Sequence, residues 1–143
     1  PYLVVHGVAV LLDFLQRAFN AQQLLSPMMR PDGSIGHAEV KIGDSVVMVE
    51  DASPYMGTKA PPASGLEGSP AALFIYVEDV DAVMDLAVKL GATQERPAEN
   101  QFYGDRDGHI VDPFGHRWTV ATHVEDVPPE EMMRRMADLV KEA

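Results

Sequence analysis

The sequence predicts an α+β fold: two βαβββ modules that form a curved mixed sheet, followed by a C-terminal helix. The same order of elements, a strand, a helix and three further strands, occurs twice along the 143 residues. The copies align when Val5 is laid on Val77, and internal duplication of this kind indicates a repeated structural unit. A length of 143 residues is typical of one domain. We therefore expect a single domain over 1–143, with module 1 over about 1–51, a linker over 52–70, module 2 over about 71–123 and a helix over 129–142.

Module 1 begins with an apolar, partly β-branched run at residues 1–5, which favours a strand. Residues 8–19 carry apolar side chains at helical spacing with polar ones on the other face, the pattern of an amphipathic helix. A strand is expected over 22–29. Residues 37–42 and 45–50 then form a hairpin, because the Gly-Asp pair between them tolerates the backbone of a tight turn.

The segment 51–70 interrupts this pattern. It contains four prolines and three glycines, which oppose both helices and central strands. A loop of this length in a compact domain is usually either a linker or a functional lid. We interpret it as the linker between the modules, and the lid stays open as an alternative.

Module 2 repeats the order of module 1. A strand at 71–77 leads to Asp79, a good N-cap for a helix that runs to Leu90. Gly91 follows, the residue best suited to a left-handed C-terminal cap. The three strands that complete the module are expected over 93–98, 104–111 and 117–123.

The C-terminal helix follows two prolines and carries two acidic residues in its first turn, where they complement the helix dipole. One face of this helix is apolar and rich in methionine, a side chain that adapts to irregular interfaces. The residues of this stripe are Met132, Met133, Met136, Leu139 and Val140. The stripe packs either on the protein's own sheet or on a second subunit, and the sequence leaves both open.

Composition excludes several classes of partner. The formal net charge is −11, which argues against nucleic acid and anionic membranes, because both need a concentrated basic face. No apolar run reaches the roughly 18 residues of a membrane span. The chain has no cysteine, so disulfides and thiolate chemistry are excluded, and a reducing cytoplasm fits. We expect a cytoplasmic protein.

Few short motifs carry chemistry. The sequence contains no metalloprotease histidine pair, nucleophile elbow, phosphate-binding glycine loop or dinucleotide fingerprint. His37 and Glu39 fall on one face of a strand, which allows either a metal site or a solvated surface. The segment 104–108 is either a charged hairpin or the support of a clamp in which Arg106 binds a carboxylate or phosphate.

Several motifs nevertheless resemble those of the vicinal-oxygen-chelate superfamily, which includes glyoxalase I, bleomycin resistance proteins and extradiol dioxygenases. They are Tyr-Val-Glu-Asp-Val-Asp-Ala at 76–82, Gly-Ala-Thr at 91–93 and Asp-Pro-Phe-Gly-His-Arg-Trp at 112–118. The segments 101–106 and 122–126 are similar to the PhnB-like subgroup. The resemblance covers nearly the whole chain and implies the duplicated fold, while the Asp-Pro-x-Gly-x-x-Trp block is specific for fold and poor for activity.

The resemblance also implies where a divalent metal would bind. Superfamily enzymes place one His, Glu or Gln on each of four strands. The matching positions here are Met48, Ala72 and Thr119, with the remaining one close to Tyr2. Alanine cannot bind a metal, and thioether and hydroxyl groups are weak ligands for zinc, nickel or iron. We therefore expect neither this metal site nor another cofactor; a displaced divalent-metal site is the alternative.

The same resemblance implies a concave ligand-binding face. Alternation along the strands at 71–77 and 117–123 sends one set of side chains to this face and the apolar set to the helices. Aromatic rings, an arginine and a histidine suit a small, flat, partly anionic ligand. The expected pocket residues are Phe74, Tyr76, Arg106, Arg117, Thr119 and His123. Alternatively, the rings merely fill the space inside the sheet.

We expect a metal-free, homodimeric, small-molecule-binding protein of the bleomycin-resistance type, with an unknown ligand. The alternative is a metal-dependent lyase, isomerase or dioxygenase of the same superfamily. A third hypothesis is metal-free catalysis with His123 or Glu50 as general base. A fourth is a purely structural role through the methionine stripe of the C-terminal helix.

Overall fold

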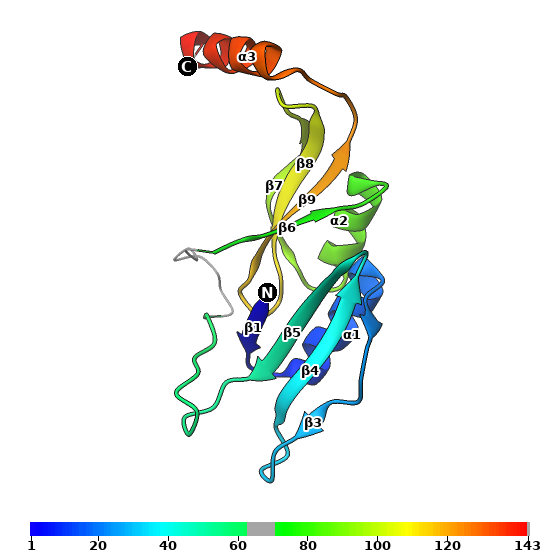
Figure 1. Ribbon diagram of the computed structural model, residues 1–143, viewed down its shortest axis with the longest axis vertical. Coiled ribbons are helices and arrows are strands. Elements are labelled where there is room, and N and C mark those ends of the chain that lie inside the picture. Colours follow the sequence, from blue (N-terminus) through cyan, green and yellow to red (C-terminus); the bar gives the residue numbers. More distant parts are fainter. Residues whose placement is uncertain (63–70, 143) are drawn as a thin grey trace.

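The computed structural model describes residues 1–62 and 71–142, which form two β-sheets and three helices (Figure 1). The first sheet has the strand order β1-β5-β4-β2, with β3 also paired to β4. Its strands are β1 (Tyr2–Val5), β2 (Gln22–Gln23), β3 (Met28–Met29), β4 (Ile35–Ile42) and β5 (Ser45–Asp51). The second sheet has the order β6-β9-β8-β7. Its strands are β6 (Leu73–Tyr76), β7 (Thr93–Asn100), β8 (Asp105–Val111) and β9 (Arg117–His123).

The two sheets repeat one topology, which confirms the predicted α+β fold with two βαβββ modules. In each, the first strand pairs in parallel with the last, β1 with β5 and β6 with β9, and the other neighbours are antiparallel. A parallel pair needs a crossover connection, and a helix supplies it in each module. These helices are α1 (Val8–Phe19) and α2 (Val80–Lys89).

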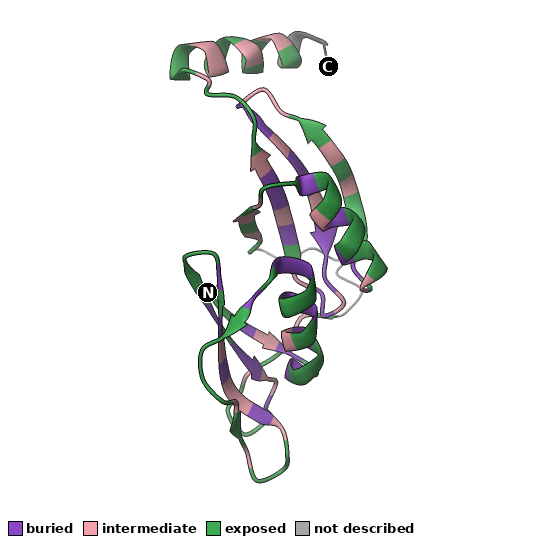
Figure 2. Ribbon diagram, turned by 90° about the vertical axis from the view of Figure 1, so that its right-hand side faces the viewer, coloured by how far each residue is buried: buried purple, intermediate pink, exposed green. Residues whose placement is uncertain are grey.

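The core lies between the sheets and these two helices (Figure 2). Leu11 and Leu15 of α1 and Val80 of α2 are fully buried, as are Val49 of β5 and Val120 of β9. The ring of Phe19 at the end of α1 packs on the indole of Trp118 in β9, with 4.8 Å between ring centroids. This contact joins the two modules through one continuous core.

One predicted strand is wrong. Residues 22–29 do not form a continuous strand, because the structure has only the two-residue strands β2 and β3 there. Pro27 lies between them and has no N–H group to donate to a neighbouring strand. The pairing of β3 with β4 also shifts its register between Met28 and Met29.

Part of the predicted linker is described. Residues 52–62 contain an isolated bridge between Ser53 and Thr58, while 63–70 lie outside the described residues. The predicted N-cap of α2 is confirmed, since the Asp79 carboxylate accepts a hydrogen bond from the N–H of Ala82 at 3.0 Å. The expected left-handed glycine is also present, with a φ of 106° at Gly91.

The Asp-Pro-Phe-Gly block forms the turn between β8 and β9. Asp112 is buried, and one carboxylate oxygen accepts hydrogen bonds from the backbone N–H groups of Phe114 and His116 at 2.9 and 3.0 Å. The other oxygen accepts from the indole N–H of Trp118 at 2.9 Å. The motif is therefore structural: its aspartate holds both the turn and the tryptophan that joins the modules.

Helix α3 (Pro129–Glu142) lies beyond the β7–β8 end of the second sheet (Figures 1 and 2). The Arg135 guanidinium links it to Glu125 of the preceding segment at 2.8 and 2.9 Å, and also pairs with Glu131 of the same helix at 2.8 Å. Met133 and Met136 are more than half exposed. No helix among the described residues is long and apolar enough to cross a membrane.

Candidate functional site

The open face of the second sheet is the face turned away from α2. Strand register aligns four of its residues in one row across the sheet: Phe74 pairs with Thr119, Thr119 with His109, and His109 with Arg96. Side chains alternate along each strand, so Arg117 and His123 lie on the same face as Thr119. The row therefore places an aromatic ring, a hydroxyl, an imidazole and a guanidinium side by side.

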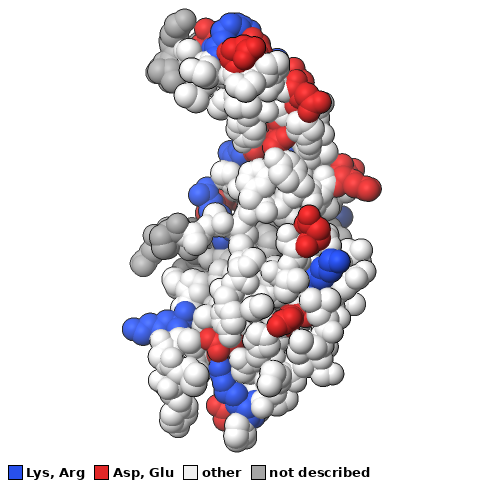
Figure 3. Space-filling model, in the orientation of Figure 1, with Lys and Arg blue, Asp and Glu red and all other residues white. Residues whose placement is uncertain are grey.

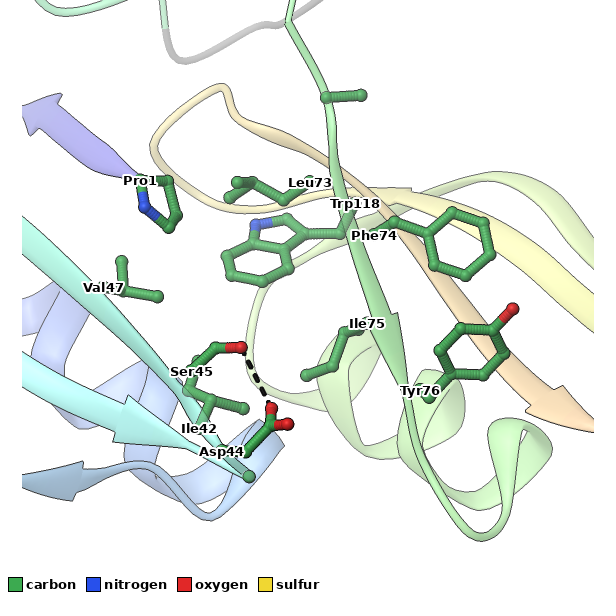
Figure 4. Close-up of a pocket in the computed structure, with 12 residues that line it drawn as sticks. Pro1, Ile42, Asp44, Ser45, Val47, Leu73, Phe74, Ile75, Tyr76 and Trp118 are labelled. Atoms are coloured by element: carbon green, nitrogen blue, oxygen red, sulfur yellow. Dashed lines mark hydrogen bonds between the residues drawn. The ribbon is translucent and has the colours of Figure 1, made fainter.

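Two exposed aromatic rings mark the edge of this face. Phe74 and Tyr76 of β6 are 54% and 61% exposed, and their ring centroids are 5.2 Å apart. Figure 4 shows both rings on one side of β6 and Ile75 and Trp118 on the other. This confirms the predicted alternation of β6. A cleft of about 490 Å³ lies between β6, the β4–β5 turn and Pro1.

A buried carboxylate connects Tyr76 to His123. Asp105 accepts a hydrogen bond from the Tyr76 hydroxyl at 2.7 Å and contacts Nδ1 of His123 at 2.8 Å. Nε2 of the same imidazole lies 2.7 Å from the exposed carboxylate of Asp126. The hydrogen bond to Asp105, followed by that to Asp126, raises the pKa of His123 above its ordinary value, so these carboxylates favour the imidazolium.

A second buried carboxylate lies further along the same face. Asp107 is fully buried and accepts hydrogen bonds from Arg96 and from the Tyr103 hydroxyl. Burial and the hydrogen bond to Asp107 raise the pKa of Tyr103. Asp107 thus fixes the guanidinium of Arg96 on the sheet.

Two guanidinium groups meet at His109. A terminal nitrogen of Arg96 lies 3.3 Å from Nε2 of the imidazole, and one of Arg117 lies 2.9 Å from Nδ1. Arg117 also donates from Nε to Glu95 at 2.6 Å. Burial, with the charges of Arg96 and Arg117, lowers the pKa of His109.

The structure brings five of the six predicted pocket residues to this face and excludes Arg106. The Arg106 guanidinium donates two hydrogen bonds of 2.8 Å to Asp81 in the first turn of α2, on the opposite face of the sheet. Sequence reasoning missed five polar residues of the open face: Arg96, Tyr103, Asp105, Asp107 and His109. The alternation of Asp105, Asp107 and His109 along one strand was the available signal.

The other candidate base, Glu50, belongs to the first sheet. It is buried and forms an ion pair of 2.8 Å with Arg30, which also donates to the carbonyl of Asp51 at 3.0 Å. Glu50 and His123 therefore lie on different sheets, in separate ion-pair networks. The pair with Arg30 holds the Glu50 side chain within the first sheet.

The positions where the resemblance implies a metal carry side chains that are weak metal ligands or none. Met48 lies on β5 opposite Tyr2 and Glu39, Ala72 precedes β6, and Thr119 lies in the row described above. Among residues 1–62 and 71–139, no three His, Asp or Glu side chains converge as a metal site. His37 and Glu39 contact each other at 2.9 Å and supply only two donors.

The visible surface carries charges of both signs. In the space-filling view, acidic and basic groups are interspersed over both modules, and neither sign forms one broad field on the side shown (Figure 3). Electrostatic recognition on the side shown would therefore be local, set by particular clusters of charged side chains.

Relatives in sequence and in structure match most of the chain. An uncharacterised protein of Mycobacterium bovis is 38% identical over 138 residues, covering 96% of this chain and 90% of its own length. TioX from Micromonospora sp. ML1 is 26% identical with a TM-score of 0.63, over 87% of this chain and 96% of that chain. The genomically encoded fosfomycin resistance protein FosX from Listeria monocytogenes shares the fold, with 17% identity, a TM-score of 0.65 and 94% coverage of both chains.

The family model of the glyoxalase/bleomycin resistance protein/dioxygenase superfamily matches residues 2–120, which cover the first module and the second module as far as the middle of β9. The chain belongs to the glyoxalase/bleomycin resistance protein/dioxygenase superfamily.

Proposed function

We propose that this protein binds a small, flat organic molecule on the open face of its second sheet, without a metal ion. The observation that carries this proposal is the exposed Phe74–Tyr76 ring pair on the edge strand of that face. Large apolar rings are seldom left in solvent together unless they contact a ligand or partner. Their partners on β9 are Thr119 and Ala121, whose small side chains leave space on the face beside the rings.

The polar groups of the face complement the rings. A binding site combines a mostly apolar surface with a few fixed polar groups that orient the ligand. Here Asp105 fixes the Tyr76 hydroxyl and the His123 imidazole, while Arg117 is held by Glu95. Planar molecules stack on aromatic rings, so a flat ligand with polar substituents fits this arrangement.

A ligand screen by thermal shift tests this function. The library is run with EDTA and with added Mn²⁺ or Zn²⁺, on the wild type, Phe74→Ala and the control Tyr55→Ala, which removes a solvent-exposed ring in the loop after β5. A ligand at 100 times its Kd adds about 2.7 kcal/mol to the stability of the folded state. We expect hits in EDTA that stabilise the wild type and Tyr55→Ala but not Phe74→Ala. Stabilisation that requires the metal would instead favour the metal-dependent lyase, isomerase or dioxygenase.

We also propose that the protein is a homodimer in which α3 contacts the second subunit. Met133, Met136 and Leu139 are more than half exposed along one stripe of this helix. The test is light scattering on the wild type, on Met133→Glu/Met136→Glu and on a control, Val10→Glu, which changes an exposed apolar residue of α1. A dimeric wild type and control with a monomeric double variant is the expected result; a monomeric wild type would contradict the proposal.

Two finer assignments complete the proposal. The segments at 101–106 and 122–126 support membership of the PhnB-like subgroup, a resemblance that carries no activity with it.

The absence of cysteine supports a cytoplasmic location, where disulfides do not form. Fractionation of cells that produce the tagged protein tests the location, and recovery outside the cytoplasm would contradict it.

A further inference from the structure

The imidazole of His109 is surrounded by donors. Its two ring nitrogens lie 3.3 and 2.9 Å from terminal nitrogens of Arg96 and Arg117. A neutral imidazole has one N–H donor and one acceptor, and an arginine has donors only. Whichever tautomer His109 adopts, one of its nitrogens carries a proton that faces a guanidinium N–H. The cluster therefore has more donors than acceptors.

The nearby carboxylates hold the arginines but do not remove this excess. Asp107 accepts from Arg96 and Tyr103, and Glu95 accepts from Nε of Arg117. The two guanidinium contacts with His109 remain after these bonds are counted. The Arg96 side chain is partly buried and that of Arg117 is exposed, so the surplus donors are open to an acceptor supplied from outside the chain.

The electrostatic potential at His109 also favours a negative ligand. Burial, Arg96 and Arg117 lower the pKa of His109, and they outweigh the opposing charges of Asp107 and Glu95. In a protein with a formal net charge of −11, this edge of the open face is thus locally positive at the imidazole. A negative group bound here would relieve both the electrostatic and the hydrogen-bonding conflict.

We propose that Arg96, His109 and Arg117 form an oxyanion subsite that binds the carboxylate or phosphate of the ligand. The inference rests on the proposed ligand-binding function and names the ligand's chemical class: a flat molecule with an acidic group. Thr119 separates His109 from Phe74 in the row across the sheet. Strands lie about 4.8 Å apart, so the two ends of such a ligand would be about 10 Å apart.

The test follows the imidazole of His109 by NMR while inorganic phosphate or benzoate is added at constant ionic strength in chloride. The groups that face this imidazole are Arg96, Arg117, Asp107 and Glu95, so its titration reports on the subsite. The variants are Arg117→Gln, Arg96→Lys and the control Arg106→Gln, whose guanidinium lies on the opposite face bound to Asp81. Arg96→Lys keeps a cation beside the buried Asp107, so folding is preserved.

The expected result is a saturable shift of the His109 signals and a rise of its pKa with at least one of the two anions. Binding should weaken by about tenfold or more in Arg117→Gln, because a charge-assisted hydrogen bond is lost, and stay unchanged in Arg106→Gln. Phosphate alone or benzoate alone would identify the acidic group. No saturable shift with either anion, or equal binding in Arg117→Gln, would overturn the subsite. A library hit that stabilises the wild type and Arg117→Gln equally would keep the ligand-binding function while rejecting the subsite.

Discussion

The two modules begin their helices in different ways at equivalent positions. In module 2, Asp79 caps α2 with its own side chain, and Thr122 of β9 accepts a further hydrogen bond from the N–H of Val80 at 2.9 Å. In module 1, the residue before α1 is Gly7, which has no side chain to offer. Asp51 at the end of β5 instead accepts hydrogen bonds from the N–H groups of Gly7 and Val8 at 2.8 and 3.0 Å.

This difference shows two ways in which the duplicated fold satisfies the N–H groups at the start of a helix. Asp51 pairs with Val5 in the first module, and Thr122 donates to the carbonyl of Val77, the residue that aligns with Val5, in the second. The last strand of each sheet therefore supports the helix beside it. Where the cap residue itself is glycine, the strand supplies a charged group, and where the cap is an aspartate, a hydroxyl suffices.

The largest expected difference in stability is between variants of two turns, the β8–β9 turn and the β4–β5 turn. Asp112→Ala leaves three donors around the β8–β9 turn without their acceptor, and two or more buried unsatisfied groups should cost about 3 kcal/mol or more of unfolding free energy. Asp44→Ala in the β4–β5 turn removes an exposed carboxylate bonded to Ser45 and should cost less than about 0.5 kcal/mol. Urea denaturation measures both, and equal losses would show that the turns are equivalent.

The next effect separates the two helix caps. Asp51→Ala removes the acceptor for the N–H groups of Gly7, Val8 and Ile35, and we expect a loss of about 2–3 kcal/mol. Thr122→Val keeps the shape of the side chain and removes the acceptor for the N–H of Val80. Because Asp79 still caps α2, we expect this variant to lose only about 1 kcal/mol of unfolding free energy. Chemical denaturation of both variants at neutral pH checks the order. A larger loss in Thr122→Val would contradict the division of roles proposed for the two strands.

The caps should also differ in their response to acid. Burial raises the pKa of Asp51, but hydrogen bonds from the N–H groups of Ile35, Val8 and Gly7 outweigh it and hold that pKa below its ordinary value. A carboxyl whose pKa is depressed by folding stabilises the protein above its unfolded pKa, about 3.9 for Asp, and this stabilisation is lost as the pH falls through the folded value. The stability difference between wild type and Asp51→Ala should therefore shrink below about pH 4, while that for Thr122→Val stays constant. Denaturation curves at several pH values measure both differences.

The smallest effect concerns two histidines of the same open face. Hydrogen bonds to Asp105 and Asp126 raise the pKa of His123, whereas burial and two arginines lower that of His109. NMR titration should place the two on opposite sides of about 6.5, the ordinary value. Asp105→Asn should lower the pKa of His123 and leave that of His109 nearly unchanged. Two coincident titrations would show that the face has one electrostatic environment.

The duplicated fold could be predicted because its signals are local and repeat. Alternation along β6 and β9 correctly separates Phe74 and Tyr76 from Trp118 and Val120, since a regular strand exposes every second side chain. The parity of β7 could not be predicted, because its register shifts between Gln94 and Arg96 and again before Glu99. These irregularities change which residues share a face, and so the sequence did not reveal Arg96.

The sequence also did not predict on which face of β8 the Arg106 side chain lies, for a different reason. The sequence predicts a strand over 104–111 but not its register against β9. In the structure Arg106 pairs with Thr122, so Asp105 and Asp107 lie on the open face and Arg106 does not. The carboxylates stay buried only because Tyr76, Tyr103 and Arg96 reach them from other strands or loops. Such convergence depends on tertiary packing, which no local pattern encodes.

The ionic attachment of α3 makes its position dependent on the solvent. Arg135 links the helix to Glu125 of the preceding segment, and none of residues 129–139 is buried. Dissolved salt weakens attraction between exposed charges, with a screening distance of roughly 8 Å at physiological ionic strength and 3 Å at 1 M. We therefore expect α3 to open more readily than the modules, and proteases to cut it faster in concentrated salt. Asp105 and Asp107 of the open face are buried and so less screened, and the same salt should affect their contacts less than it affects the helix.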